Sequence, residues 1–202
     1  MFSLTFTPFN HIATLMRLNM PYDFETIKAE LDKEEWPVAN LRNWPDGKRA
    51  KLIRPKSKLL LEIFNFINSN DARMSVVESF DKYVPQVEER WRWDKDKVFR
   101  NTTLHAEFTR DLPGMFQNVH MDTKFLIGTG MIYLTPQHDP NWATKFHATD
   151  QPDSWYEVTP SDYCNGWMHM NDWNSWHSGG NLTDEVRYTI LVPLTLANKI
   201  EL

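Results

Sequence analysis

The sequence is poor in cysteine and has no long apolar run. Cys164 is the single cysteine among 202 residues, which excludes an internal disulfide and favours a reducing compartment. No stretch approaches the length of a membrane-spanning helix, and the residues after Met1 lack the basic segment and apolar run of a signal peptide. We therefore expect a cytoplasmic protein without a membrane partner.

An excess of positive charge is also absent. The formal net charge is −5, from 27 acidic and 22 basic side chains, which argues against a protein whose main partner is nucleic acid. One basic stretch is interpreted as a solvated surface leading into a helix, with polyanion binding as the alternative. Its members are Lys48, Arg49, Lys51, Arg54, Lys56 and Lys58.

Internal repeats and low-complexity tracts are missing as well. Hydrophobic residues make up 41% of the chain and charged residues 24%, which is typical of a globular protein. At this length one sizeable core is expected, so residues 1–202 are interpreted as a single domain.

The two halves of the chain differ in periodicity. Residues 1–97 are predicted to be a mostly helical supporting region, with helices after Asp23, from Lys58, and from Ala72 to Phe80. Residues 98–202 favour short strands separated by Pro, Gly, Asn and Asp, which is typical of a sandwich or jelly roll. The predicted strands are Phe99–Arg110, Phe116–His120, Phe125–Thr135, Trp155–Val158, Trp167–Met170 and Val186–Leu194. The sequence thus predicts a mainly β protein with N-terminal helices.

A His-x-Asp pair ends one of these strands. Because residues i and i+2 of an extended chain face the same side, His120 and Asp122 can converge on one point. A second histidine would complete a face of two histidines and one carboxylate, which suits non-haem iron and leaves positions open for other ligands. His177, in Asn174-Ser-Trp-His-Ser-Gly-Gly, is the best candidate.

A cation opens the last predicted strand. Arg187 would be costly to bury without a partner, and the distal carboxylate of 2-oxoglutarate would suit its fork of donors. Thr189 shares the face of Arg187 and can add a hydroxyl.

Taken in order, His120-Met-Asp122, His177 and Arg187-Tyr-Thr189 resemble the pattern of the Fe(II)/2-oxoglutarate-dependent dioxygenase superfamily, in particular its prolyl-hydroxylase-like members. That pattern is HxD, a distal His, and Arg-x-Ser on the last core strand. Flanking segments agree with it: Arg110-Asp-Leu-Pro-Gly, Ile132-Tyr-Leu-Thr-Pro and Ser175-Trp-His-Ser. The resemblance covers residues 99 to 194.

The resemblance implies a double-stranded β-helix, the jelly-roll or cupin-like core, over residues 98–202. It implies Fe(II) held by His120, Asp122 and His177, and 2-oxoglutarate anchored by Arg187 and Thr189. The implied reaction uses O₂, converts 2-oxoglutarate to succinate and CO₂, and hydroxylates a small-molecule or peptidyl substrate. The carboxylate of Asp122 favours hydroxylation, because related halogenases carry a small residue there.

The chain departs from its relatives at two positions. Met115 stands where they usually have Tyr. A tyrosine of prolyl-hydroxylase-like members that touches 2-oxoglutarate is matched by Ile132, with Tyr133 predicted to face the other way. Further contacts to the acid are therefore assigned to three candidates: Arg110, Asn118 and Lys124.

Alternatives remain at this point. His105-Ala-Glu107 is a rival His-x-carboxylate pair, and Arg187 can also be a structural ion-pair residue. Other histidines are interpreted as surface or pocket residues: His138, His147 and His169. A cupin-like metalloenzyme that does not use 2-oxoglutarate, and a jelly-roll binding protein without a metal, are the competing functions. The substrate and the oligomeric state stay open.

Overall fold

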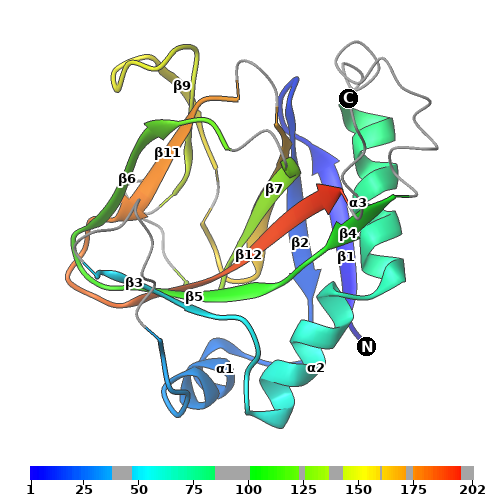
Figure 1. Ribbon diagram of the computed structural model, residues 1–202, viewed down its shortest axis with the longest axis vertical. Helices are drawn as coiled ribbons and strands as arrows, with labels where there is room; N and C mark the ends of the chain where they lie inside the picture. Colours follow the sequence, from blue (N-terminus) through cyan, green and yellow to red (C-terminus); the bar gives the residue numbers. More distant parts are fainter. Residues whose placement is uncertain are drawn as a thin grey trace.

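Two antiparallel sheets face each other, and helices cover the outer face of the larger one (Figure 1). The structure is a computed structural model that describes residues 1–37, 47–84, 101–122, 126–136, 143–159, 161–171 and 175–196. None of the helices in these ranges is long and apolar enough to cross a membrane.

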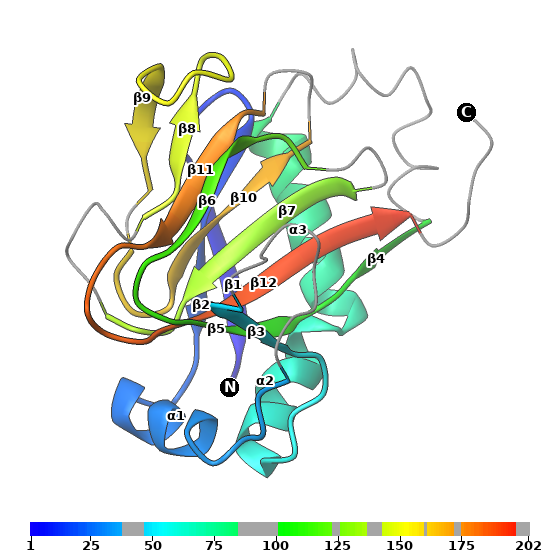
Figure 2. The same ribbon diagram turned by 60° about the vertical axis from the view of Figure 1, so that its left-hand side comes forward.

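The larger sheet carries strands from both halves of the chain. Its order is β1 (Ser3–Pro8), β2 (Ala13–Asn19), β10 (Asn165–Met170), β7 (Leu126–Tyr133), β12 (Arg187–Leu196), β5 (Glu107–Asp111) and β3 (Arg49–Leu52), and β4 (Thr102–Leu104) also pairs with β12. The smaller sheet has the order β6 (Met115–His120), β11 (His177–Asn181), β8 (Lys145–His147) and β9 (Trp155–Val158). From β5 to β12 the chain passes back and forth between the two sheets, and only β8 and β9 are consecutive strands of the same sheet (Figure 2).

The three expected helices are present in the N-terminal half. They are α1 (Phe24–Leu31), α2 (Lys58–Ile67) and α3 (Asn70–Tyr83). Asp23 caps α1 by accepting a hydrogen bond from the backbone N–H of Thr26, and Ser69 caps α3 in the same way. In α2 the buried positions Leu60, Ile63 and Ile67 follow helical spacing, so one face of the helix is buried in the large apolar core.

The alternation of β12 divides the interior into two regions. Tyr188, Ile190, Val192 and Leu194 belong to the large apolar core between the sheet and the helices. Arg187, Thr189 and Leu191 lie on the opposite side, between the two sheets. The helices therefore stabilise a sheet whose inner face is left for polar side chains.

Several elements differ from the sequence-based expectation. The supposedly helical N-terminal half also supplies β1, β2 and β3, and the strand predicted over Phe99–Arg110 is interrupted between β4 and β5. β8 and β11 were not predicted, because β8 is short and β11 contains two glycines, which are uncommon in strands. The boundary predicted between residues 97 and 98 lies outside the described residues.

Candidate metal centre and anion-binding cavity

Strand pairing brings the two predicted histidine ligands together. β11 runs antiparallel to β6, and His177 is the direct partner of His120 across the two strands. The centroids of their rings are 4.3 Å apart. Two residues separated by more than fifty positions in the chain are thereby placed at one end of the smaller sheet, where the space between the sheets begins.

Asp122 completes the group. Its Oδ1 lies 3.8 Å from His120 Nε2, and its Oδ2 lies 3.9 Å from His177 Nε2. One potential ligand atom from each of the three residues lies within 4.8 Å of the others, and no other such group occurs among the described residues. Asp122 Oδ2 is buried without a well-formed hydrogen bond to any described residue, which suits an oxygen that binds a cation.

The backbone selects the tautomer of both imidazoles. Nδ1 of His120 lies 2.8 Å from the carbonyl oxygen of Asn118, and Nδ1 of His177 lies 2.9 Å from that of Ser175. A carbonyl only accepts, so each Nδ1 carries the proton, and each Nε2, the ring nitrogen close to Asp122, is unprotonated. Gln117 agrees with this assignment, since its Nε2 lies 2.7 Å from His120 Nε2 and donates to it.

Burial keeps both imidazoles neutral. It lowers the pKa of His120 to about 4, with the neighbouring His177 acting in the same direction. It lowers the pKa of His177 to about 4 as well, with His169 adding to the effect. Burial alone would raise the pKa of Asp122, but the combined effect of its polar neighbours His177, His169, Thr129 and His120 is larger, and the pKa is lowered. At neutral pH the site therefore offers two neutral nitrogens and one carboxylate, the protonation states that metal binding requires.

His169 belongs to the surroundings of this centre. It is fully buried, and its Nε2 lies 3.7 Å from Asp122 Oδ2 and 2.8 Å from Asn171 Oδ1. The ring stacks on Trp167 at 5.2 Å with an interplanar angle of 4°. The sequence interpretation of His169 as a pocket residue fits this position, although the interpretation gave no reason for its contact with Asp122.

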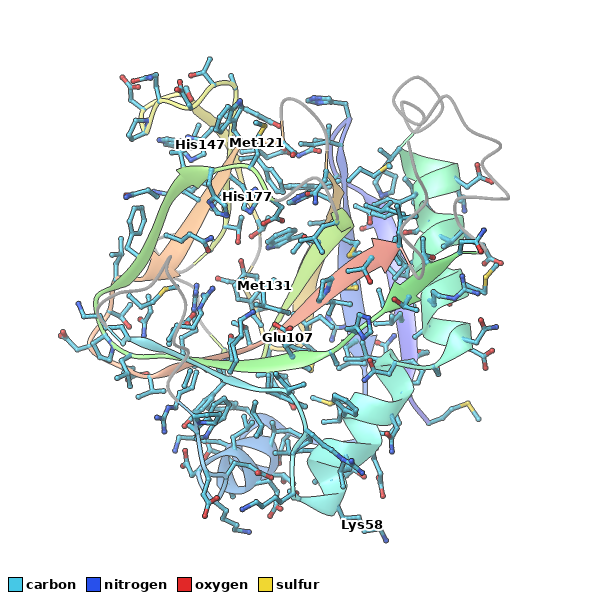
Figure 3. The ribbon with its side chains drawn as sticks, viewed as in Figure 1. Lys58, Glu107, Met121, Met131, His147 and His177 are labelled. Carbon is cyan, nitrogen blue, oxygen red and sulfur yellow. The ribbon has the colours of Figure 1, made fainter. Side chains whose placement is uncertain are left out.

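A cavity of about 330 Å³ begins at His120, Asp122 and His177 and extends into the space between the sheets. In Figure 3, His177 lies on the smaller sheet and Met131 and Glu107 lie on the larger one. The lining combines apolar side chains with several charged and hydroxyl groups. It consists of Arg49, Lys51, His105, Glu107, Gln117, His120, Asp122, Leu126, Thr129, Met131, Thr144, Trp167, His177, Ser178, Gly179, Arg187, Leu191, Pro193 and Thr195.

Arg187 lies in the wall of this cavity, as the sequence predicts, but it has an internal partner. It is 2% exposed, and its Nε and Nη2 donate to Asp111 Oδ2 at 3.1 and 2.6 Å. Its Nη1 donates to the carbonyl oxygen of Gly180 at 2.6 Å. The cost of burying the guanidinium is therefore offset within the protein, as in the alternative in which Arg187 is an ion-pair residue.

The remaining predicted contacts to the acid do not gather in the cavity. Thr189 shares the face of Arg187, but its hydroxyl is hydrogen-bonded to that of Thr109 at 2.5 Å. The Arg110 guanidinium packs over the Trp36 ring, on the helix side of the sheet. Asn118 is exposed. Lys124 lies outside the described residues, as does His138.

The expected orientation of Tyr133 is wrong. Ile132 is buried in the core on the helix side, while Tyr133 packs between the sheets with Met131, Phe146 and Trp167. The Tyr133 hydroxyl lies 3.0 Å from Thr144 Oγ1 and 3.1 Å from Thr159 Oγ1. Neighbouring positions of a strand face opposite sides, so Tyr133 rather than Ile132 faces the space between the sheets.

The rival pair does not form a comparable centre. His105 and Glu107 line the cavity, but His105 Nε2 is hydrogen-bonded to Thr103, and Glu107 forms an ion pair with Lys51 at 2.5 Å. His147 is bonded to Ser178 rather than to the three-residue group.

The fold is similar to that of known oxygenases. No protein-family model matches the sequence, and no curated protein does. A prolyl-4-hydroxylase from Pseudomonas putida aligns over 94% of this chain and 95% of its own, with a TM-score of 0.62 and 13% identity. A 2OG-Fe(II) oxygenase family member from Burkholderia pseudomallei aligns over 85% of this chain and 77% of its own, with a TM-score of 0.53 and 13% identity.

A viral collagen prolyl hydroxylase from Paramecium bursaria Chlorella virus-1, solved with 2OG, aligns over 85% of this chain and 88% of its own, with a TM-score of 0.50 and 10% identity. The resemblance predicted from the motif is therefore confirmed at the level of the fold.

Proposed function

We propose that the protein is an Fe(II)- and 2-oxoglutarate-dependent dioxygenase that hydroxylates a small-molecule or peptidyl substrate. The observation that carries this proposal is the convergence of His120, Asp122 and His177 at one end of a cavity whose wall contains the buried Arg187. The similarity in fold to 2OG-Fe(II) oxygenases supports it. So does the strand order, which we interpret as a double-stranded β-helix with β5–β12–β7–β10 in one half and β6–β11–β8–β9 in the other.

The described residues fit both groups that this function needs. Two neutral imidazoles and one carboxylate suit Fe(II), and three ligands leave positions for a cosubstrate and O₂. Asp122 Oδ2, buried without a well-formed hydrogen bond, gains a partner when a cation binds. At the other end of the cavity the guanidinium of Arg187 suits a carboxylate.

Each side chain then has a distinct part. His120, Asp122 and His177 would hold the iron, and Arg187 would orient 2-oxoglutarate by its distal carboxylate. The apolar lining from Met131, Leu191 and Trp167 keeps water away from the path between them. When bound, the two groups supply the oxidation: one oxygen atom of O₂ enters a substrate C–H bond, the other enters succinate, and CO₂ leaves.

The direct test is anaerobic titration of the purified protein with Fe(II) and 2-oxoglutarate. We expect one equivalent of Fe(II) to bind, and the weak visible charge-transfer band of the iron chelate to appear when 2-oxoglutarate is added. On admission of O₂, with candidate substrates present, succinate should form. The variants His120→Ala and Asp122→Ala should lose both the band and succinate formation.

The matched control is His11→Ala, because His11 is exposed and stacks on Tyr156 away from the cavity. This variant should bind and react like the wild-type protein. A metal-dependent reaction that survives Arg187→Ala would identify a cupin-like enzyme that does not use 2-oxoglutarate. Failure of the wild-type protein to bind stoichiometric Fe(II) would contradict both readings.

A further inference from the structure

Three charged side chains form a row across neighbouring strands of the larger sheet. Arg49 on β3 and Arg187 on β12 are the direct cross-strand partners of Asp111 on β5, one from each side. All three are buried, with exposures of 2%, 2% and 0%. Two of the three, Arg49 and Arg187, line the cavity.

One carboxylate serves both guanidinium groups. Arg49 donates from Nε to Asp111 Oδ1 at 2.5 Å and from Nη2 to Oδ2 at 2.8 Å. Oδ2 also accepts from Nε and Nη2 of Arg187. Burial alone would raise the pKa of Asp111, but the two guanidinium groups lower it, so the carboxyl group stays ionised.

The charges of this row determine how strongly Arg187 attracts an anionic ligand. With Asp111 alone, Arg187 would form a neutral pair, and its attraction for an anion in the cavity would be largely cancelled. Arg49 adds one positive charge on the far side of the same carboxylate. The three groups together then carry a net charge of +1, while Asp111 still fixes the plane of the Arg187 guanidinium.

We propose that Arg49 is a positioning residue for cosubstrate binding: it neutralises Asp111, so that Asp111 can orient Arg187 without removing its positive charge. This inference rests on the proposed function and deepens it. It assigns a role to a member of the basic stretch around residues 48–58 that the sequence analysis interpreted as solvated surface. It also makes the anion end of the site depend on β3, a strand outside the segment that carries the motif.

The test measures the dissociation constants of two 2-oxo acids by anaerobic titration of the Fe(II)-loaded protein. 2-Oxoglutarate carries the distal carboxylate and 2-oxobutyrate lacks it. Arg49→Gln should weaken 2-oxoglutarate binding by about tenfold to a hundredfold, the range for one buried charge-assisted interaction. The same variant should leave 2-oxobutyrate and Fe(II) binding unchanged.

A charge-balanced double variant separates this role from a purely structural one. Arg49→Gln combined with Asp111→Asn removes one charge of each sign, so the affinity for 2-oxoglutarate should recover most of what the single variant loses. Arg49→Lys keeps the charge and should lose less than Arg49→Gln. Lys56→Gln is the matched control, because Lys56 belongs to the same basic stretch but its side chain is 73% exposed.

Each outcome has a defined meaning. If the double variant binds 2-oxoglutarate as weakly as Arg49→Gln or more weakly, or if Arg49→Gln weakens both acids equally, Arg49 is only structural and the inference is wrong. Unfolding temperatures of all variants identify any that fail to fold. If Arg49→Gln does not fold, Arg49→Lys and the double variant are compared with the wild-type protein instead. Wild-type protein that binds neither acid would overturn the proposed function itself.

Discussion

Lowering the pH should destabilise the metal-free protein through the two histidines of the proposed centre. Burial, reinforced by a neighbouring imidazole in each case, lowers the pKa of His120 and of His177 to about 4. In the unfolded chain a histidine titrates near pH 6.5. Between these values the unfolded state binds protons that the folded state cannot bind, so the free energy of unfolding falls as the pH falls.

The magnitude follows from the two pKa values. Between pH 7 and pH 5, each histidine should reduce the free energy of unfolding by about 2 kcal/mol. Above about pH 7 neither state is protonated at these positions, so their contribution becomes flat. His177 is the better residue for the test, because its side chain is 8% exposed and that of His120 is 26% exposed, so solvent screens the effect of burial less at His177.

The assay is urea unfolding of the chelator-treated protein at pH 7, 6 and 5. His177→Gln removes one titrating group and should reduce the pH dependence by about 2 kcal/mol over this range, which is the share of one histidine. His11→Ala, on the surface, should leave the slope unchanged. A wild-type stability that is flat or rises between pH 7 and pH 5 would show that the two histidines are not held as neutral bases.

Three substitutions test the framework around the site, each by urea unfolding at pH 7. Gly166→Ala should lower the free energy of unfolding by more than about 3 kcal/mol, because the added Cβ would lie 2.0 Å from the backbone oxygen of Met131. An unchanged free energy of unfolding would contradict the close approach of β10 and β7. Asn181→Ala should cost about 2–3 kcal/mol, because the Asn181 side-chain N–H groups satisfy the carbonyl oxygens of Asp111 and Glu185. Asn181→Asp, which keeps the shape but loses these donors, should cost a similar amount. Ser69→Ala should lower the free energy of unfolding by about 1 kcal/mol, because the hydrogen bond that caps α3 is lost. Ser69→Asp should leave it unchanged, because aspartate can form the same cap.

The local parts of the site were predictable from the sequence. The same-face rule placed His120 and Asp122 together, and the chain order of strands made the return of His177 plausible. Asp23 predicted the start of α1, and the spacing of apolar residues predicted α2. In each case the information lies within a few neighbouring residues, where backbone geometry alone limits what the side chains can reach.

The non-local parts were not predictable in the same way. The partner of Arg187 is Asp111, 76 positions away, and that of Asp111 on its other side is Arg49, a further 62 positions toward the N-terminus. No periodicity within a strand specifies which strand lies beside it, so the cross-strand row could not be assigned. Tyr133 shows the same limit within one strand, since the period of two separates the faces of β7 but does not specify which face lies between the sheets.

The two ends of the cavity depend on different chemistry, and this makes them separable in experiment. The proposed metal centre at His120, Asp122 and His177 would require deprotonated ligands, so protons would compete with the metal as the pH falls toward 5. The proposed binding of the distal carboxylate would depend on the guanidinium groups of Arg187 and Arg49, which stay charged throughout this range. Acidification should therefore weaken Fe(II) binding, as measured by titration. The preference for 2-oxoglutarate over 2-oxobutyrate should stay constant at every pH at which the protein is saturated with metal, because we expect this preference to come from the guanidinium groups. A preference that fell in parallel with metal affinity would show that the distal carboxylate is held by a titrating group rather than by Arg187.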